Sequence, residues 1–147
     1  MKIMGFNFTK INIEKFLDKV ENLKVTTNIN IEDLKEIKVA PFKIKEDIIV
    51  VKFAYSIYYE PKFAKIEMEG NVVLGIEPKL TREVLKQWKD KKTPEEFRIV
   101  LFNAILRKTN LKAIQLEDEM NLPLHMPMPS LKPQEKQESI KTPPNNL

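Results

Sequence analysis

The chain contains no cysteine and only one histidine among its 147 residues. Without cysteine it can form neither disulfides nor thiolate metal sites, and one imidazole is too few for a centre built from several histidines. Only three glycines are present, each isolated, so no glycine-rich loop is available to cradle a phosphate. The chain therefore lacks most of the groups that catalytic sites commonly use. We therefore expect a protein that is not an enzyme and that carries no cofactor or metal.

Long apolar runs are also missing. No stretch approaches the roughly 18 residues that a membrane span requires, and the chain does not open with a signal-peptide pattern. Together with the lack of cysteine, this favours the cytoplasm. With 42% hydrophobic and 31% charged residues, the sequence suits one domain with a real core. We expect that domain to span residues 1–131, followed by a disordered polar tail at 132–147.

Charge of one sign is not concentrated anywhere. The net charge is +4 and the pI is near 9.1, but lysines alternate with glutamates along the whole chain. This interleaving argues against a dedicated nucleic-acid surface. Tyr55, Tyr58 and Tyr59 beside Lys52 and Lys62 could nevertheless stack bases. A nucleic-acid-binding module therefore stays as an alternative function, as does a scaffold subunit with one dedicated protein partner.

The sequence is rich in period-two alternation between residues 48 and 76. Two apolar sets flank a loop at residues 60–63, and their spacing predicts a β-hairpin with both sets on one face and Tyr55 opposite Met68. The sets are Ile49, Val51, Phe53, Tyr55, Ile57 and Tyr59, and then Ala64, Ile66, Met68, Val72, Leu74 and Ile76.

The other face of the first hairpin strand is unusually apolar for a surface. Val50, Ala54 and Tyr58 lie there, separated by Lys52 and Ser56. Exposed apolar area of this kind usually marks a binding or assembly surface. We expect these three residues to require either a second subunit or a bound polypeptide.

Two earlier segments predict the remaining strands. Residues 4–13 change phase between Phe8 and Ile11, which predicts a bulge near Thr9 and Lys10. Residues 23–31 alternate between apolar and polar, and residues 34–41 are expected to form a connector. Four strands in succession suggest an antiparallel, meander-like sheet.

The apolar period becomes helical after the hairpin. Thr81 is the expected N-cap of a short helix that ends at about Lys89 and turns Trp88 inward. Thr93 and Glu96 have the spacing of a capping box, which predicts the start of a long helix. Its apolar stripe is core, or in part a homo-oligomer contact. The stripe comprises Ile99, Phe102, Leu106, Thr109, Ala113, Leu116 and Met120.

The long helix should end near Asn121, before a proline-stiffened arm at residues 122–129. Met126 and Met128 offer adaptable contact surface there, or pack onto their own domain. His125 suits acid–base work near neutral pH, but no nucleophile lies near it in sequence. We interpret it as an incidental surface or packing histidine. Glu117, with its acidic neighbours 118–119, is interpreted as exposed helix surface.

The order of these elements resembles the SecB family of export chaperones over about residues 1–131. The run from Phe8 to Lys10, followed by Ile11 and Ile13 with Phe16, looks like that family's first strand. The hairpin is similar in length and phase. The segment at 122–131 follows the long helix much as a Pro- and Leu-bearing segment does in that family.

The resemblance implies an α+β fold, a four-stranded antiparallel sheet packed with a short and a long C-terminal helix. It also implies a cytoplasmic homo-oligomer, a tetramer, that holds unfolded polypeptide clients without ATP and is linked to protein export. Such a protein needs no cofactor. The candidate residues for client binding or the subunit interface are Phe8, Val50, Ala54, Tyr58, Trp88, Met126 and Met128.

Overall fold

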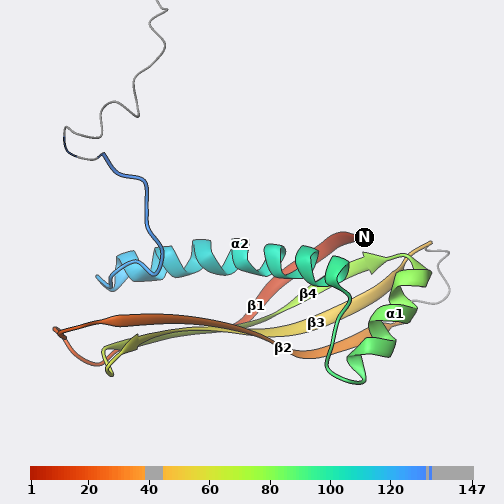
Figure 1. Cartoon of the computed structure of the whole chain (residues 1–147), viewed down its shortest axis with the longest axis horizontal. Helices are drawn as coiled ribbons and strands as arrows, with labels where there is room; N and C mark the ends of the chain where they lie inside the picture. Colours follow the sequence, from red (N-terminus) through yellow and green to blue (C-terminus); the bar gives the residue numbers. More distant parts are fainter. Residues whose placement is uncertain (39–44, 132, 134–147) are drawn as a thin grey trace, which may run out of the picture.

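The computed structural model describes residues 1–38, 45–131 and 133. These residues form the strands β1 (Lys2–Lys15), β2 (Lys24–Ile37), β3 (Asp47–Glu60) and β4 (Ala64–Ile76) and the helices α1 (Pro78–Trp88) and α2 (Glu95–Glu119). The four strands build one antiparallel sheet, α2 lies along one of its faces, and α1 lies at one end (Figure 1). The predicted α+β fold is confirmed. The tail expected to be disordered falls, except for Pro133, outside the described residues.

The strand order across the sheet is β1-β4-β3-β2. The meander-like order holds for β2, β3 and β4, each of which pairs with the next. β1 departs from it, because it pairs with β4 rather than with β2. This is a Greek-key arrangement. Its consequence is that β1 and β2 are the two edges of the sheet, with the long hairpin between them.

The β3–β4 hairpin has the register that its alternation predicts. Tyr55 faces Met68, and Phe53 faces Gly70. The apolar sets of both strands are almost completely buried on the face that α2 covers. Period-two alternation therefore placed the core correctly, since a slip of one residue would have turned every one of these side chains outward.

The two edge strands contain bulges. The register of β1 shifts between Phe8 and Lys10, as predicted, and the shift brings Phe8 and Ile11 to the same face. β1 also shifts between Ile3 and Gly5. In β2 a shift follows Ile31, and it returns Leu34 to the core side, where it is buried. The expected connector at residues 34–41 was therefore wrong up to Ile37, where β2 ends, and its part at residues 39–41 lies outside the described residues. A bulge, rather than a strand end, broke the alternation there.

The first helix begins earlier than expected. α1 starts at Pro78, whose fixed φ suits a first helical position. Thr81 is consequently not the N-cap. It lies inside the helix, where its hydroxyl donates to the carbonyl of Glu77 at 3.1 Å.

The long helix begins without the predicted capping box. Pro94 is the cap residue of α2, and no side-chain cap bond is formed. Thr93 is buried instead, and its carbonyl oxygen accepts a bond from Arg98 Nη1 at 3.1 Å. The helix ends at Glu119, close to the expected position.

The buried stripe of α2 is rotated from the predicted one in its first half. Ile99 is 51% exposed and Phe102 is half-buried. The apolar residues at 100, 101 and 105 made the predicted stripe too wide to show which side of the helix faces the sheet. In the structure the buried side begins with Phe97. Phe102 consequently lies at the side of the helix, above β2. The buried residues are Phe97, Leu101, Ile105, Thr109, Ala113, Leu116 and Glu117.

Candidate functional site

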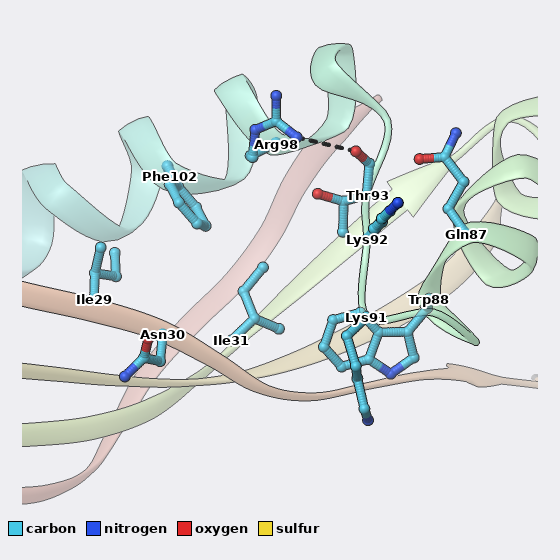
Figure 2. A pocket seen from close by; sticks show the side chains of 10 residues that line it. All are labelled: Ile29, Asn30, Ile31, Gln87, Trp88, Lys91, Lys92, Thr93, Arg98 and Phe102. Carbon is cyan, nitrogen blue, oxygen red and sulfur yellow. Dashed lines mark hydrogen bonds between the residues drawn. The ribbon is translucent and has the colours of Figure 1, made fainter.

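A groove opens between the edge strand β2 and α2, beside the connection that joins the two helices (Figure 2). Its volume is about 550 Å³. Ile29 and Ile31 of β2 and Phe102 of α2 line it, together with Trp88 at the end of α1. All four side chains are half-buried. They remain partly open because β2 is the outermost strand and α2 covers only part of it.

The edge of β2 adds a second kind of binding surface to this groove. β2 pairs with β3 on one side only, and no described strand lies on its other side. The outward backbone N–H and C=O groups of β2 can therefore pair with an extended chain. An apolar groove along a free strand edge suits a polypeptide in extended conformation.

The turn after α1 fixes the position of Trp88. The Lys91 N–H donates to the Trp88 carbonyl at 2.8 Å, and the Lys92 N–H donates to the Gln87 carbonyl at 3.1 Å. This is the bonding pattern of a Schellman turn, and Lys91 has the positive φ, 59°, that such a turn requires. The ammonium nitrogen of Lys91 lies 4.5 Å from the centre of the Trp88 ring.

Three of the candidate residues lie on the opposite face of the sheet. Val50, Ala54 and Tyr58 point away from α2, and we call them the open-face column. Tyr58 is 36% exposed, and Val50 and Ala54 are half-buried. Within the described part of the chain no helix covers this face (Figure 1).

Phe8 does not join the open-face column. It lies on the helix-covered side of β1, where its ring centroid is 5.2 Å from that of Phe6 and 6.4 Å from that of Phe53. It pairs with Gly70. A methyl group at Gly70 would lie 2.9 Å from the Phe53 ring, so glycine leaves the space that this aromatic cluster fills.

The three tyrosines do not form a base-stacking platform. Tyr55 and Tyr59 are 2% and 1% exposed and belong to the core, whereas Tyr58 points to the opposite face. The alternative of a nucleic-acid-binding sheet therefore loses two of its three stacking residues.

The C-terminal arm starts packed and then becomes exposed. Leu122 is buried, whereas Met126 is 38% and Met128 52% exposed. The arm leaves α2 at the end opposite to α1, so the two methionines lie away from the groove (Figure 1). The structure thus distributes the seven candidate residues over several places rather than gathering them.

The start of the arm is held by a buried polar network that the sequence did not predict. Glu117 is fully buried. Its carboxylate accepts a bond from the Tyr59 hydroxyl and lies 2.9 and 3.0 Å from Nδ1 of His125. Nε2 of His125 lies 3.0 Å from Oδ1 of Asn110, which also accepts a bond from the Tyr55 hydroxyl at 3.1 Å.

The prediction that Glu117 is helix surface was therefore wrong, and His125 is a packing residue whose side chain is only 4% exposed. Glu117 follows Ala113 by one helical turn, so its position on the buried stripe was a signal for burial. Both nitrogens of His125 face side-chain oxygens of the protein. The arrangement joins arm, helix and strand, and it leaves neither nitrogen open to a substrate.

Burial, together with this network, raises the pKa of two tyrosines. Burial, with the nearby Glu117 charge, raises the pKa of Tyr55 from 10.0 to about 12. Burial also raises the pKa of Tyr59, and the hydrogen bond to Glu117 raises it further. In each case the neutral phenol is favoured in the folded protein.

Stability is consequently expected to fall above pH 10. Between pH 10 and 12 both tyrosines lose their phenol protons in the unfolded chain but keep them in the folded protein. The free energy of unfolding therefore falls by about 1.4 kcal/mol per pH unit for each tyrosine. Urea unfolding at pH 9, 10 and 11 measures the slope. Tyr55→Phe should remove roughly half of the tyrosine contribution, and equal slopes for the wild type and this variant would contradict the account.

Comparison with solved structures shows a likeness in fold. A solved structure of a SecB-like chaperone from Mycobacterium tuberculosis, in complex with a ChAD peptide from the HigA1 antitoxin, aligns with a TM-score of 0.50. The alignment covers 88% of this chain and 89% of that chain, at 11% sequence identity. The chain has a SecB-like fold. At this identity the likeness concerns the fold alone.

Sequence comparisons add no relative. No protein-family model matches the chain, and no curated protein matches it. Among the described residues, no helix is both long and apolar enough to cross a bilayer, and no group of three or more His, Cys, Asp or Glu side chains is placed to hold a metal ion.

Proposed function

We propose that this protein is an ATP-independent chaperone that holds non-native polypeptides, and that its clients bind in the groove beside β2. The observation that carries the proposal is the combination of an apolar groove with a free strand edge. An extended client can form backbone hydrogen bonds with β2 while its apolar side chains enter between Ile31 and Phe102. Unfolded chains expose free backbone groups throughout and apolar side chains at many positions.

Two further points support this function. The solved SecB-like chaperone that shares the fold was captured with a peptide, which is the class of ligand proposed for this groove. Holding a client also requires no chemical step, in keeping with the expectation from the sequence that the protein is not an enzyme. We further propose that it acts as a cytoplasmic homo-oligomer, with Phe8, Met126 and Met128 as additional client or subunit contacts, and that client holding is linked to protein export.

The test is suppression of aggregation without nucleotide. An unfolded client, such as a chemically denatured enzyme diluted into buffer, should stay in solution when the protein is present in molar excess. Suppression should persist at 1 M salt, because apolar contacts do not weaken as phosphate contacts do. A monomeric protein that leaves aggregation unchanged would exclude the proposal.

The open-face column gives a separate prediction. Tyr58→Ser and Val50→Asp should each weaken client holding without unfolding the protein, since both side chains reach the uncovered face. Native mass measured on the same samples assigns the cause. A smaller particle would make the column a subunit contact, and an unchanged particle would make it a client contact. Full holding activity and an unchanged mass in both variants would remove the column from the account.

A further inference from the structure

The groove beside β2 is lined by three cations and by no carboxylate. Lys91, Lys92 and Arg98 line it together with the apolar residues, and all three are exposed (Figure 2). Within the described parts of the chain none of them forms an ion pair. Glu96, on the same turn of α2 as Arg98, lines a different hollow together with Glu83.

Arg98 is placed to bind a carboxylate. Its Nη1 donates to the carbonyl of Thr93, which is buried, so one edge of the guanidinium is held. Guanidinium has five N–H donors, and most of them remain for a ligand in the groove. A carboxylate can take two of them in parallel, which is the strongest of the common charged hydrogen-bonding geometries.

Lys91 stands where the backbone favours glycine. At φ 59° its backbone is in the left-handed region, which residues with a side chain rarely adopt. The turn holds the Lys91 ammonium over the Trp88 ring, and both residues line the groove. Positive charge is thereby fixed beside the apolar surface that a client would cover.

We propose that the groove prefers client segments in which aspartate or glutamate lies next to aliphatic or aromatic residues. The inference rests on the proposed function and specifies its ligand. Apolar side chains of the client contact Ile31 and Phe102, and its carboxylate pairs with Arg98, while the two lysines add to the positive potential along the groove. Charge complementarity across a partly desolvated groove gives selectivity among clients that are otherwise equally apolar.

Trp88 provides the readout, because it is the only tryptophan in the chain. The probes are three synthetic peptides without tryptophan, each an extended apolar sequence that differs at one central position, which is Glu, Gln or Lys. Titration of the full chain, followed by Trp88 fluorescence, gives a Kd for each. We expect the Glu peptide to bind about fivefold more tightly than the Gln peptide at low salt, and the Lys peptide to bind most weakly.

Variants connect the preference to the cations. Arg98→Gln and Lys91→Gly should each reduce the ratio of the Gln to the Glu peptide Kd toward one, and glycine at 91 suits the positive φ, so the turn should persist. Lys89→Gln is the matched control. It removes the same charge from a residue outside the groove lining, and the ratio should stay near five.

The outcomes separate this inference from the function on which it rests. If all three peptides bind with equal Kd and change Trp88 fluorescence, the groove binds clients but the acidic preference is wrong. If no peptide binds while client aggregation is still suppressed, the preference is again wrong and clients use another surface. If a single-stranded oligonucleotide displaces the Glu peptide at physiological salt, the cations serve phosphate and the inference is overturned.

Discussion

Replacing Glu117 by alanine is expected to lower the free energy of unfolding by about 2 to 4 kcal/mol, because the change removes the central acceptor of a buried hydrogen-bond network. The Tyr59 hydroxyl loses its charged acceptor, and Nδ1 of His125 loses both carboxylate oxygens. Nδ1 of His125 is then buried without its partner, whereas the Tyr59 hydroxyl keeps the Pro123 carbonyl as its acceptor. The unsatisfied imidazole is the larger part of the cost.

Glu119→Ala is the matched control for this change. Glu119 lies on the same turn of α2 but is exposed, so its removal should alter the unfolding free energy by no more than about 0.5 kcal/mol. Glu117→Gln should fall between the two, since an amide oxygen still accepts a bond but carries no charge. Equal stability of the two alanine variants in urea unfolding would contradict the network.

The arm should respond to the same substitution. His125 in the arm is held by its contacts with the Glu117 carboxylate. The single proton of the Tyr59 hydroxyl can go either to Glu117 or to the Pro123 carbonyl, so His125 is the arm residue that depends on Glu117. In Glu117→Ala, proteolysis within residues 122–131 should therefore become faster than in Glu119→Ala. This second readout distinguishes release of the arm from a general loss of stability.

Phe102→Ala is expected to weaken binding of an unfolded client about tenfold or more. Phe102 offers the groove an aromatic side chain that is half-buried before a client arrives, and side chains of this kind dominate binding energy at protein interfaces. Alanine preserves helix propensity, so α2 should remain intact. Client affinity can be measured by fluorescence anisotropy of a labelled, permanently unfolded polypeptide.

Ile99→Ala provides the comparison on the same helix. Ile99 is more exposed than Phe102 but does not line the groove. Its removal should change client affinity by less than about twofold, because apolar exposure alone does not make a residue part of a binding site. Similar losses in both variants would mean that clients contact α2 non-specifically rather than through the groove.

The sequence predicted the central hairpin fully and the sheet edges only in part. In β3 and β4 the alternation is unbroken on the core face, and a single register buries both apolar sets. At Ile31 a bulge shifts the phase, which made the rest of β2 look irregular. The pairing of β1 with β4 joins segments some sixty residues apart, and no local pattern encodes that choice.

The candidate site was predicted in a similarly uneven way. The sequence named Trp88 as a client or subunit contact but predicted no groove beside it. Ile29 and Ile31 were not named, because their alternation places them on the core face of β2. Only the partial cover of an edge strand by α2 leaves them accessible. Glu117 was missed because its partner Tyr59 lies 58 positions away in the sequence.

The most direct test of client binding in the groove is hydrogen–deuterium exchange of the full chain with and without a permanently unfolded polypeptide. A client that pairs with β2 and covers the helix connection should slow exchange at backbone amides within residues 27–33 and 88–102. The backbone amides of β3, which carries the open-face column and does not line the groove, provide an internal comparison. Unchanged exchange along β2 and the helix connection at saturating client would contradict the account, even if aggregation were suppressed.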